Sequence, residues 1–599
     1  MVAFLNQLLE AEPQLRAKLI TFTRAATAEL ARTVSDHANQ TVQRPSTIHS
    51  FAISILLRNP GAGNFPKPLR IADDYEDSEI IRPTLARRIN VHQTRLNALF
   101  REMASDWEFL EHRELPRIDN NDRIRFNAGW NQHRQVMGYT LLAELPFALR
   151  HALINHDNLQ GCDFDLLVVD EYQDLNACEL GILRSLAQRG CTIVAAGDDD
   201  QSIYSFRYAS PIGIREFPQQ YEHCHSYDLT VTQRCSRRIV EWASHVIQHD
   251  LTRAADRALL QTIDGARDGE TALLRFADGD AEARGVAELA SQLININGIA
   301  PSDILILLRG DNRGMFSRPI KDQLDARNIP YSNPDGELNE LYEPSNRAIV
   351  ATCRLFTDGR DSLAWASLMK LAAGIGGAAF DYIYDRAAAN GVSFGQELFD
   401  SRQLHFPGGP RNMRNVEALI TRTLEWHAGH EPPDRTPEGG WGHWLIENSG
   451  DIAVPTDLFR QILFDLDELV EPGIPLAQFL SQLTPLCKDH ALASSGGIRI
   501  MSMDGSKGLT VRAAIVAGLD HGVIPRPNAD QNEECRRLYV AMTRAKEFLF
   551  GTWAQQRHGP AARAGGQAVG DFRDACAFLR NGPVQSVAGN PFLQNRGQQ

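Results

Sequence analysis

The sequence lacks the features that mark several common classes of protein. Its nine cysteines are scattered and form no CxxC pair, which argues against a structural zinc site and against a disulfide framework. It contains no run of about eighteen or more apolar residues, so we expect no membrane-spanning helix. The first residues lack the basic start and the small-residue cleavage site of a secretory signal. We therefore expect a cytoplasmic protein.

Positive charge is also in short supply. The chain has 75 acidic and 61 basic residues and a net charge of −14, which argues weakly against a protein that coats duplex DNA electrostatically. A groove that stacks single-stranded bases on aromatic side chains needs only a local basic lining. The net charge therefore leaves a single-stranded DNA partner open.

Two acidic residues follow directly on a short apolar run. Residues 166–169 are all apolar and two of them are β-branched, which predicts a strand buried on both faces. Ligands of open parallel α/β sheets bind outside the carboxyl ends of the strands, so the adjacent carboxylates can hold a metal ion and orient a water molecule. We assign Mg²⁺ to Asp170 and the water to Glu171. The alternative is that both acids merely end the strand and cap the next helix.

A second apolar strand, residues 192–197, leads into a loop of similar character. The segment 198–207 combines three acids, a glutamine and two aromatics, which suit a sensor loop better than a core. The strings VVDEYQDLN and GDDDQSIYSFR, about thirty residues apart, resemble the Walker B motif and the following motif of the UvrD/Rep family. The members of this family are ATP-driven helicases of superfamily 1.

Two strings near the start resemble the DNA-contacting motifs of the same family. In TFTRAATAEL, Thr23 corresponds to the threonine that faces the DNA strand, and in PSTIHSF, Thr47 and His49 correspond to residues that grip the DNA backbone. A histidine beside apolar residues is also compatible with a place in the core. In the loop after the second strand, Tyr204 and Phe206 are the candidate stacking surfaces for bases.

Three later strings complete the resemblance. In LTVTQRCS, Arg234 matches an arginine that contacts the γ-phosphate, and in SKGLT, Lys507 and Gly508 match a motif that couples nucleotide to DNA. EECRRLYVAMTRA ends in the position of the family's arginine finger, Arg544, whose planar guanidinium can stabilise a transferring phosphoryl group. Thr510 departs from the pattern, because the family has there a glutamate that reaches the nucleotide sugar.

The phosphate-binding loop GxxxxGK[ST] of such helicases is missing from the sequence. Backbone N–H groups of this Walker A loop cradle the phosphates, and its lysine reaches them. The segment Gly61-Ala62-Gly63 lies on the wrong side of the first strand and has no GK pair. Met1 stands where the helix after the loop would begin, so we expect an N-terminally truncated chain, through a misplaced start, a fragment or a decayed motor.

The resemblance implies an α/β fold of two RecA-like P-loop NTPase-type domains, each with a mainly helical insertion. A chain of 599 residues is too long for a single core, and the sheet pattern gives way twice to polar helical stretches. We expect a first motor domain at 1–57 and 148–225 with a helical insertion at 58–147, a second motor domain at 226–337 and 495–556 with a mobile, helical accessory insertion at 338–494, and a mobile tail at 557–599.

The resemblance further implies an ATP-dependent 3′-5′ DNA helicase or single-stranded DNA translocase in DNA repair, recombination or replication. Its partners would be single-stranded DNA and duplex junctions, its cofactors ATP and Mg²⁺, and its state a monomer. The alternative is a non-hydrolysing DNA-binding or regulatory protein that keeps the scaffold without the phosphate loop. Hydrolysis would fall to Glu171, Gln201, Arg234 and Arg544, the metal to Asp170, and nucleotide contacts to Asp170, Gln201, Arg234, Lys507, Gly508 and Arg544.

Overall fold

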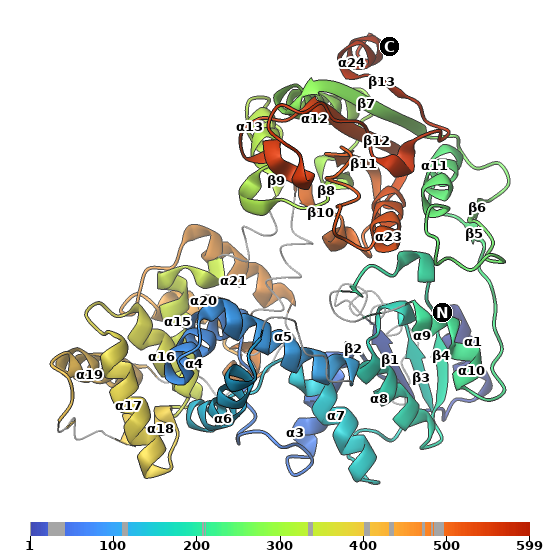
Figure 1. Cartoon of the computed structure of the whole chain (residues 1–599). Coiled ribbons are helices and arrows are strands. Elements are labelled where there is room, and N and C mark those ends of the chain that lie inside the picture. Colours follow the sequence, from blue (N-terminus) through green and yellow to red (C-terminus); the bar gives the residue numbers. More distant parts are fainter. Residues whose placement is uncertain are drawn as a thin grey trace.

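The computed structural model describes residues 2–21, 42–110, 118–205, 209, 211–332, 340–400, 406, 408–430, 436–469, 474–480, 483 and 496–598. Two parallel sheets and their covering helices confirm the predicted α/β class. Figure 1 shows the second sheet at the top, the first at the lower right and a group of helices at the lower left. None of the described helices is long and apolar enough to cross a membrane.

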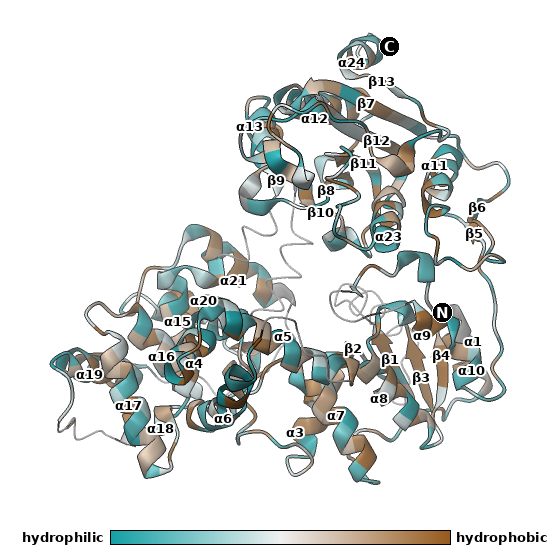
Figure 2. Cartoon of the chain, in the orientation of Figure 1, coloured by the Kyte–Doolittle hydropathy of each residue, from teal (hydrophilic) through white to brown (hydrophobic). Residues whose placement is uncertain are grey.

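The first sheet has four parallel strands in the order β2-β1-β3-β4. Alternate residues of the strands point to opposite faces, so Leu19 and Val168 pack with α1 on one face while Ile20 and Val169 pack with α3, α7 and α8 on the other. Figure 2 shows the apolar character of β3 and β4. The elements are β1 (Ala17–Thr21), β2 (Val42–Thr47), β3 (Leu166–Val169), β4 (Thr192–Ala195), α1 (Val2–Ala11), α3 (Ile48–Arg58), α7 (Glu144–Asn155) and α8 (Ala177–Ala187).

The second sheet has seven parallel strands in the order β13-β7-β12-β11-β8-β10-β9. Helices α11 and α23 pack on one face, and α12, α13 and α24 pack on the other. The elements are β7 (Glu270–Asp278), β8 (Ile304–Leu308), β9 (Tyr331–Ser332), β10 (Ile498–Ser502), β11 (Val511–Ala517), β12 (Ala545–Gln556), β13 (Ser586–Ala588), α11 (Arg237–Ile247), α12 (Gly279–Asn295), α13 (Ser317–Asp325), α23 (Gln531–Met542) and α24 (Gly589–Arg596).

Short elements connect these parts. A separate pair of strands lies next to α11, and single helical turns follow several strands. They are β5 (Val231–Thr232), β6 (Gln261–Thr262), α9 (Ile212–Arg215), α10 (Phe217–Gln220), η2 (Tyr172–Asp174), η3 (Asp199–Gln201), η5 (Pro301–Asp303), η6 (Asn312–Gly314), η8 (Asp504–Ser506), η9 (Gly559–Gly566) and η10 (Ala577–Leu579).

The C-terminal segment differs from its prediction as a mobile tail at 557–599. Strand β13 pairs with β7 at the edge of the second sheet, and α24 packs against α12. Cys576, Phe578 and Leu579 join the apolar core beneath α11. The composition of the segment, rich in Gly and Ala, hid these few apolar residues, whose burial depends on a sheet edge that the rest of the chain supplies.

Two groups of helices occupy the predicted insertions. The first group contains η1 (Glu76–Ile81), α4 (Arg82–Ile89), α5 (Gln93–Phe109) and α6 (Asn120–Met137). The second contains η7 (Glu340–Tyr342), α15 (Pro344–Thr357), α16 (Ser362–Leu371), α17 (Gly377–Asn390), α18 (Phe394–Asp400), α19 (Met413–Gly429), α20 (Trp441–Asn448) and α21 (Asp457–Leu469).

The two helical groups share one apolar core. Trp130 and Tyr139 of the first group and Trp365 and Tyr384 of the second belong to the same buried cluster. The rings of His133 and Tyr384 stack across the boundary with their centroids 5.7 Å apart. Helices α15 to α19 contribute to this shared core, whereas α20 and α21 pack with part of α15 in a separate cluster. The mobility of the accessory insertion stays a prediction.

Candidate active site

The carboxylates predicted to carry the chemistry lie where β3 ends. Glu171 has φ 53°, in the left-handed region that non-glycine residues rarely adopt, and such strained conformations cluster at functional sites. Burial, and then the charge of Glu171, raise the pKa of Asp170. A bound cation would favour the charged form of Asp170, so this residue fits the role of a metal ligand.

The carboxylate at this site suits a hard cation that also binds phosphate oxygens and water. No group of three or more His, Cys, Asp or Glu side chains that could hold a metal ion occurs in the part of the chain that the structure describes. Mg²⁺ is typically bound through one or two carboxylates together with phosphate oxygens and water, so a single carboxylate such as Asp170 is compatible with it.

The predicted sensor, Gln201, lies in η3 just after β4 and contacts both halves of the molecule. Its Nε2 donates to Oδ2 of Asp198 over 2.7 Å, within the same loop. Its Oε1 accepts a hydrogen bond of 3.1 Å from Nη2 of Arg544, which directly precedes β12 of the second sheet. The structure therefore brings together two predicted site residues that are 343 positions apart.

Gln173 connects the two acidic loops of the first sheet. Its Nε2 donates to Oε2 of Glu171 over 2.6 Å, and its Oε1 accepts from the backbone N–H of Asp198 over 3.0 Å. Gln173 is fully buried, and a Cβ at Gly197 would lie 2.5 Å from its Oε1. The position of Glu171 is thus tied to that of the sensor loop. The local sequence predicts no separate role for Gln173, although it stands within the VVDEYQDLN string.

Lys507 crosses from the second sheet to the first. Its Nζ donates to Oδ1 of Asp174 and to the backbone carbonyl of Gln201, both over 2.7 Å, and lies 3.6 Å from Oε2 of Glu171. The next residue, Gly508, has φ 83°, which glycine adopts without strain. Asp174, which the sequence analysis did not assign to the site, is therefore the main partner of a predicted site residue.

Two arginines of the second half complete the predicted cluster. Arg544 is buried, and it donates through Nε to the carbonyl of Val540 as well as to Gln201. Burial, and then the positive charge of Arg234, lower the pKa of Arg544 to about 10, which leaves it protonated at neutral pH. Arg234 itself is exposed. Both therefore carry the positive charge that a phosphate group requires.

The profile of the UvrD/REP helicase N-terminal domain matches residues 10–222, and that of the UvrD-like helicase C-terminal domain matches residues 412–556. The chain belongs to the UvrD-like helicases of superfamily 1. Its two parallel sheets are consistent with the two RecA-like domains of this family.

Individual relatives agree with this assignment. The ATP-dependent DNA helicase PcrA of Leuconostoc citreum is 26% identical in an alignment of 594 positions that covers 90% of this chain and 76% of the relative. The ATP-dependent DNA helicase PcrA of Bacillus subtilis is 26% identical over 66% of this chain and 55% of its own length. The ATP-dependent DNA helicase UvrD1 of Mycobacterium tuberculosis is 26% identical over 67% and 57%, respectively. The chain thus spans little more than half of two of these relatives.

The structure describes only some of the residues of this UvrD-like chain that are predicted to contact DNA. Thr47 caps α3, because its Oγ1 accepts from the backbone N–H of Ser50 over 3.2 Å. His49 Nδ1 lies 4.0 Å from Oε1 of Glu179. Thr23 and Phe206 lie outside the described residues.

Tyr204, the other candidate stacking surface, lies at the contact between the two halves. Its hydroxyl donates to the backbone carbonyl of Asp504 over 3.3 Å, and Nζ of Lys507 lies 5.3 Å from the centre of its ring. Arg537 of α23 donates to the carboxylate of Asp504 over 2.5 Å. In this arrangement the ring of Tyr204 faces the second half of the UvrD-like chain.

Proposed function

We propose that this UvrD-like chain is an ATP-dependent DNA helicase or single-stranded DNA translocase that moves 3′ to 5′ and serves DNA repair, recombination or replication. The observation that carries the proposal is the hydrogen bond between Gln201 and Arg544 across the two sheets, together with the link from Glu171 through Gln173 to the loop of Gln201. ATP hydrolysis needs a base, a γ-phosphate sensor and an arginine in one place, and these three residue types meet that need. The relatives' names support the same activity.

The residues have the following proposed roles. Asp170 would hold Mg²⁺, which when bound neutralises charge on the phosphates. Glu171 orients the attacking water and accepts its proton, while Gln173 holds the carboxylate in place. Arg234 and Arg544 stabilise negative charge that develops on the phosphoryl oxygens. Gln201 senses the γ-phosphate.

Coupling to DNA would pass through the loops that join the two halves. Lys507 contacts Asp174 and Gln201 at once, so a change at the nucleotide can alter the SKGL loop, whose counterpart in the family couples nucleotide to DNA. Tyr204 and Phe206 follow Gln201 in the same loop and are the proposed stacking surfaces for bases. Single-stranded DNA and its junctions with duplex are the proposed substrates.

The proposal predicts the behaviour of Glu171→Gln in protein purified from its own cells. This variant should bind ATP with unchanged affinity but lose DNA-stimulated hydrolysis by on the order of a thousandfold, because an amide is a far weaker base than a carboxylate. Glu241→Gln, on the surface of α11, is the matched control. Unwinding should occur on duplexes with a 3′ single-stranded tail and not on those with a 5′ tail.

Two results would overturn this proposal. Unchanged hydrolysis by Glu171→Gln would remove Glu171 from the chemistry. An unmodified protein that hydrolyses no ATP, and binds single-stranded DNA equally with and without it, would instead be the non-hydrolysing DNA-binding protein described above as the alternative.

A further inference from the structure

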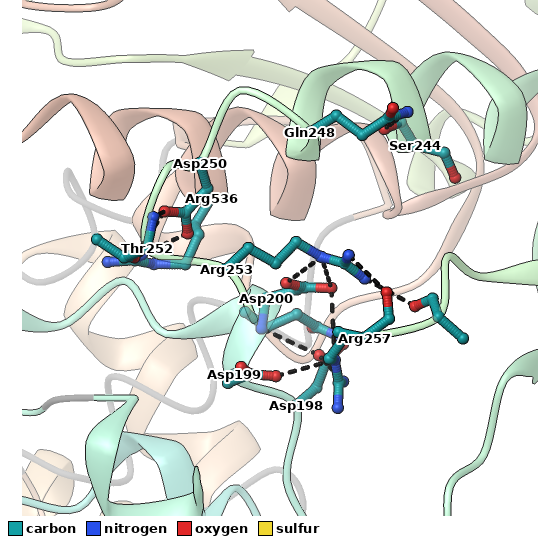
Figure 3. Close-up of polar contacts among 12 residues, drawn as sticks. Asp198, Asp199, Asp200, Ser244, Gln248, Asp250, Thr252, Arg253, Arg257 and Arg536 are labelled. Carbon is teal, nitrogen blue, oxygen red and sulfur yellow. Dashed lines mark hydrogen bonds and ion pairs between the residues drawn. The ribbon is translucent and has the colours of Figure 1, made fainter. Parts of the chain in front are cut away.

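Three consecutive aspartates, Asp198, Asp199 and Asp200, begin the sensor loop, which we define as residues 198–205. Adjacent carboxylates repel one another, and those of Asp199 and Asp200 are almost completely buried. Burial, and then the charge of Asp198, raise the pKa of Asp200 to about 6. The loop in this conformation therefore depends on nearby positive charge. Arg215 of α9 pairs with Asp199 over 2.7 Å, and Figure 3 shows two further arginines, which come from the segment after α11.

The first of these arginines is Arg253. Its Nε lies 3.0 and 3.1 Å from the two carboxylate oxygens of Asp200. Its two terminal nitrogens donate to the backbone carbonyls of Arg257 and Ala258 over 2.8 and 2.7 Å. Arg253 thus neutralises Asp200 and at the same time shapes the chain that carries the second arginine.

Arg257 faces all three acids. Its Nη2 donates to Oδ1 of Asp198 over 2.9 Å, and its Nε lies 3.0 Å from Oδ1 of Asp199 and 3.8 Å from Oδ2 of Asp200. The other oxygen of Asp198, Oδ2, accepts from Nε2 of Gln201. One carboxylate is therefore shared between Arg257 and the predicted γ-phosphate sensor.

The two arginines and the three aspartates come from opposite halves of the molecule. The aspartates follow β4 of the first sheet, whereas the segment 248–260 follows α11 of the second. Asp250 anchors this segment through an ion pair of 2.6 Å with Arg536 of α23 (Figure 3). Nε of Arg536 also donates to the carbonyl of Ser202 over 2.7 Å. The contact between Arg253, Arg257 and the aspartates therefore links the sensor loop to the second sheet.

We propose that Arg253 and Arg257 are positioning residues of the active site, which hold Gln201 in its catalytic orientation through Asp198 and couple this orientation to the position of the second sheet. The inference rests on the proposed function in one respect, because it takes Gln201 to be the γ-phosphate sensor. Neither arginine touches the nucleotide in this scheme. Each acts through the aspartates that it pairs with.

The test uses Arg257→Gln and Arg253→Gln in the full chain, with Arg267→Gln as the matched control because Arg267 is 84% exposed. The first measurement is hydrogen exchange without nucleotide. Exchange of the amides of the sensor loop should rise about tenfold or more in both test variants, while that of α11 stays unchanged and shows that the chain is folded. Arg257 is partly exposed, so its variant has the smaller risk of unfolding.

The second measurement is steady-state ATP hydrolysis with single-stranded DNA. We expect kcat to fall by about ten- to a hundredfold and KM to change by less than about threefold, as for the loss of an orienting group behind a catalytic residue. Arg257→Lys should rescue little, because an ammonium group is a single point charge and cannot bridge Asp198 and Asp199 as the guanidinium does. Asp198→Asn combined with Arg257→Gln should lose little more than either change alone.

The two measurements separate the inference from the proposed function. Loop exchange and kcat equal to those of Arg267→Gln would overturn the inference, as would a loosened loop with normal kcat. An unmodified chain without ATP hydrolysis would overturn the proposed function, and a loosened loop in the two variants of that chain would still support the link to the second sheet.

Discussion

Glu76 forms the centre of a buried ion-pair network between the two helical groups. Its carboxylate accepts hydrogen bonds from Arg70 at 2.6 and 3.1 Å and from Arg347 of the second group at 2.8 Å. Arg70 also pairs with Asp361, and Arg347 also pairs with Asp73, at 2.7 and 2.6 Å. The substitution Glu76→Gln keeps the shape of the side chain, removes one negative charge and turns an N–H donor toward two guanidinium groups.

The expected loss of stability follows from these contacts. Breaking a buried ion pair by removing one partner costs about 3–5 kcal/mol, because an uncompensated charge remains in the interior. Each arginine of this network keeps one other carboxylate, so we expect a value near the lower limit, about 3 kcal/mol. Such a change corresponds to on the order of a hundredfold in an opening equilibrium.

Hydrogen exchange of the intact chain measures this quantity. Amides of η1 and α16 should exchange on the order of a hundredfold faster in Glu76→Gln. Glu79→Gln is the control, because Glu79 pairs with Lys370 across the same boundary but both side chains are about 40% exposed, and such pairs contribute roughly 0–1 kcal/mol. Equal exchange in both variants would refute the argument that burial makes the Glu76 network strong.

The effect should also depend on pH. Burial alone would raise the pKa of Glu76, but the charges of Arg70 and Arg347 outweigh it and lower the pKa well below its ordinary range. A group with a lowered pKa in the folded state stabilises the fold above its unfolded pKa, about 4.3, and loses this contribution as the pH falls toward the folded value. The difference between the unmodified protein and Glu76→Gln should therefore be constant from about pH 5.5 to 7 and shrink below about pH 4.

Two further predictions concern the active site. Gln173→Leu keeps the side-chain volume but removes the hydrogen bonds to Glu171 and Asp198. The kcat for ATP hydrolysis should therefore fall about ten- to a hundredfold, with the urea midpoint lowered only slightly. A normal kcat would show that Glu171 needs no such support. Lys507→Met leaves the buried carboxylate of Asp174 without its cation and should lower the free energy of unfolding in urea by about 3 kcal/mol. A change below about 1 kcal/mol would mean that the contact between the sheets is weak.

Local sequence patterns accounted for the central strands and for the identity of the chain. The apolar run that contains β3 is buried along its whole length, because a parallel sheet buries a central strand on both faces. Strand β4, at the edge of the same sheet, is only partly buried. The motif strings around Asp170, Gln201 and Arg544 are short and contiguous, so they could be read without knowledge of the fold. The helical character of the insertions was likewise visible in their polar, helix-forming composition.

Local sequence patterns could not predict the contacts between segments that are far apart in the chain. The partners of Lys507 lie 333 and 306 residues away, and Asp198, one partner of Arg257, lies 59 residues away in another half of the molecule. Arg253 and Arg257 occur in a stretch of ordinary polar composition. The local sequence there cannot distinguish an arginine in a buried ion pair from one on a solvated surface. Thr47, by contrast, caps its own helix through a neighbour three residues away, a role that local sequence can explain.

The sequence by itself determined the α/β class, the motif order and the helicase family, because each of these depends on residues that are neighbours along the chain. Only the tertiary structure decided that the two insertions share a core, that the C-terminal segment completes the second sheet, and that Gln173 and the Arg253–Arg257 pair surround the predicted catalytic groups. The physical reason is that burial and charge compensation are properties of surfaces, and these surfaces exist only after segments hundreds of residues apart have packed together.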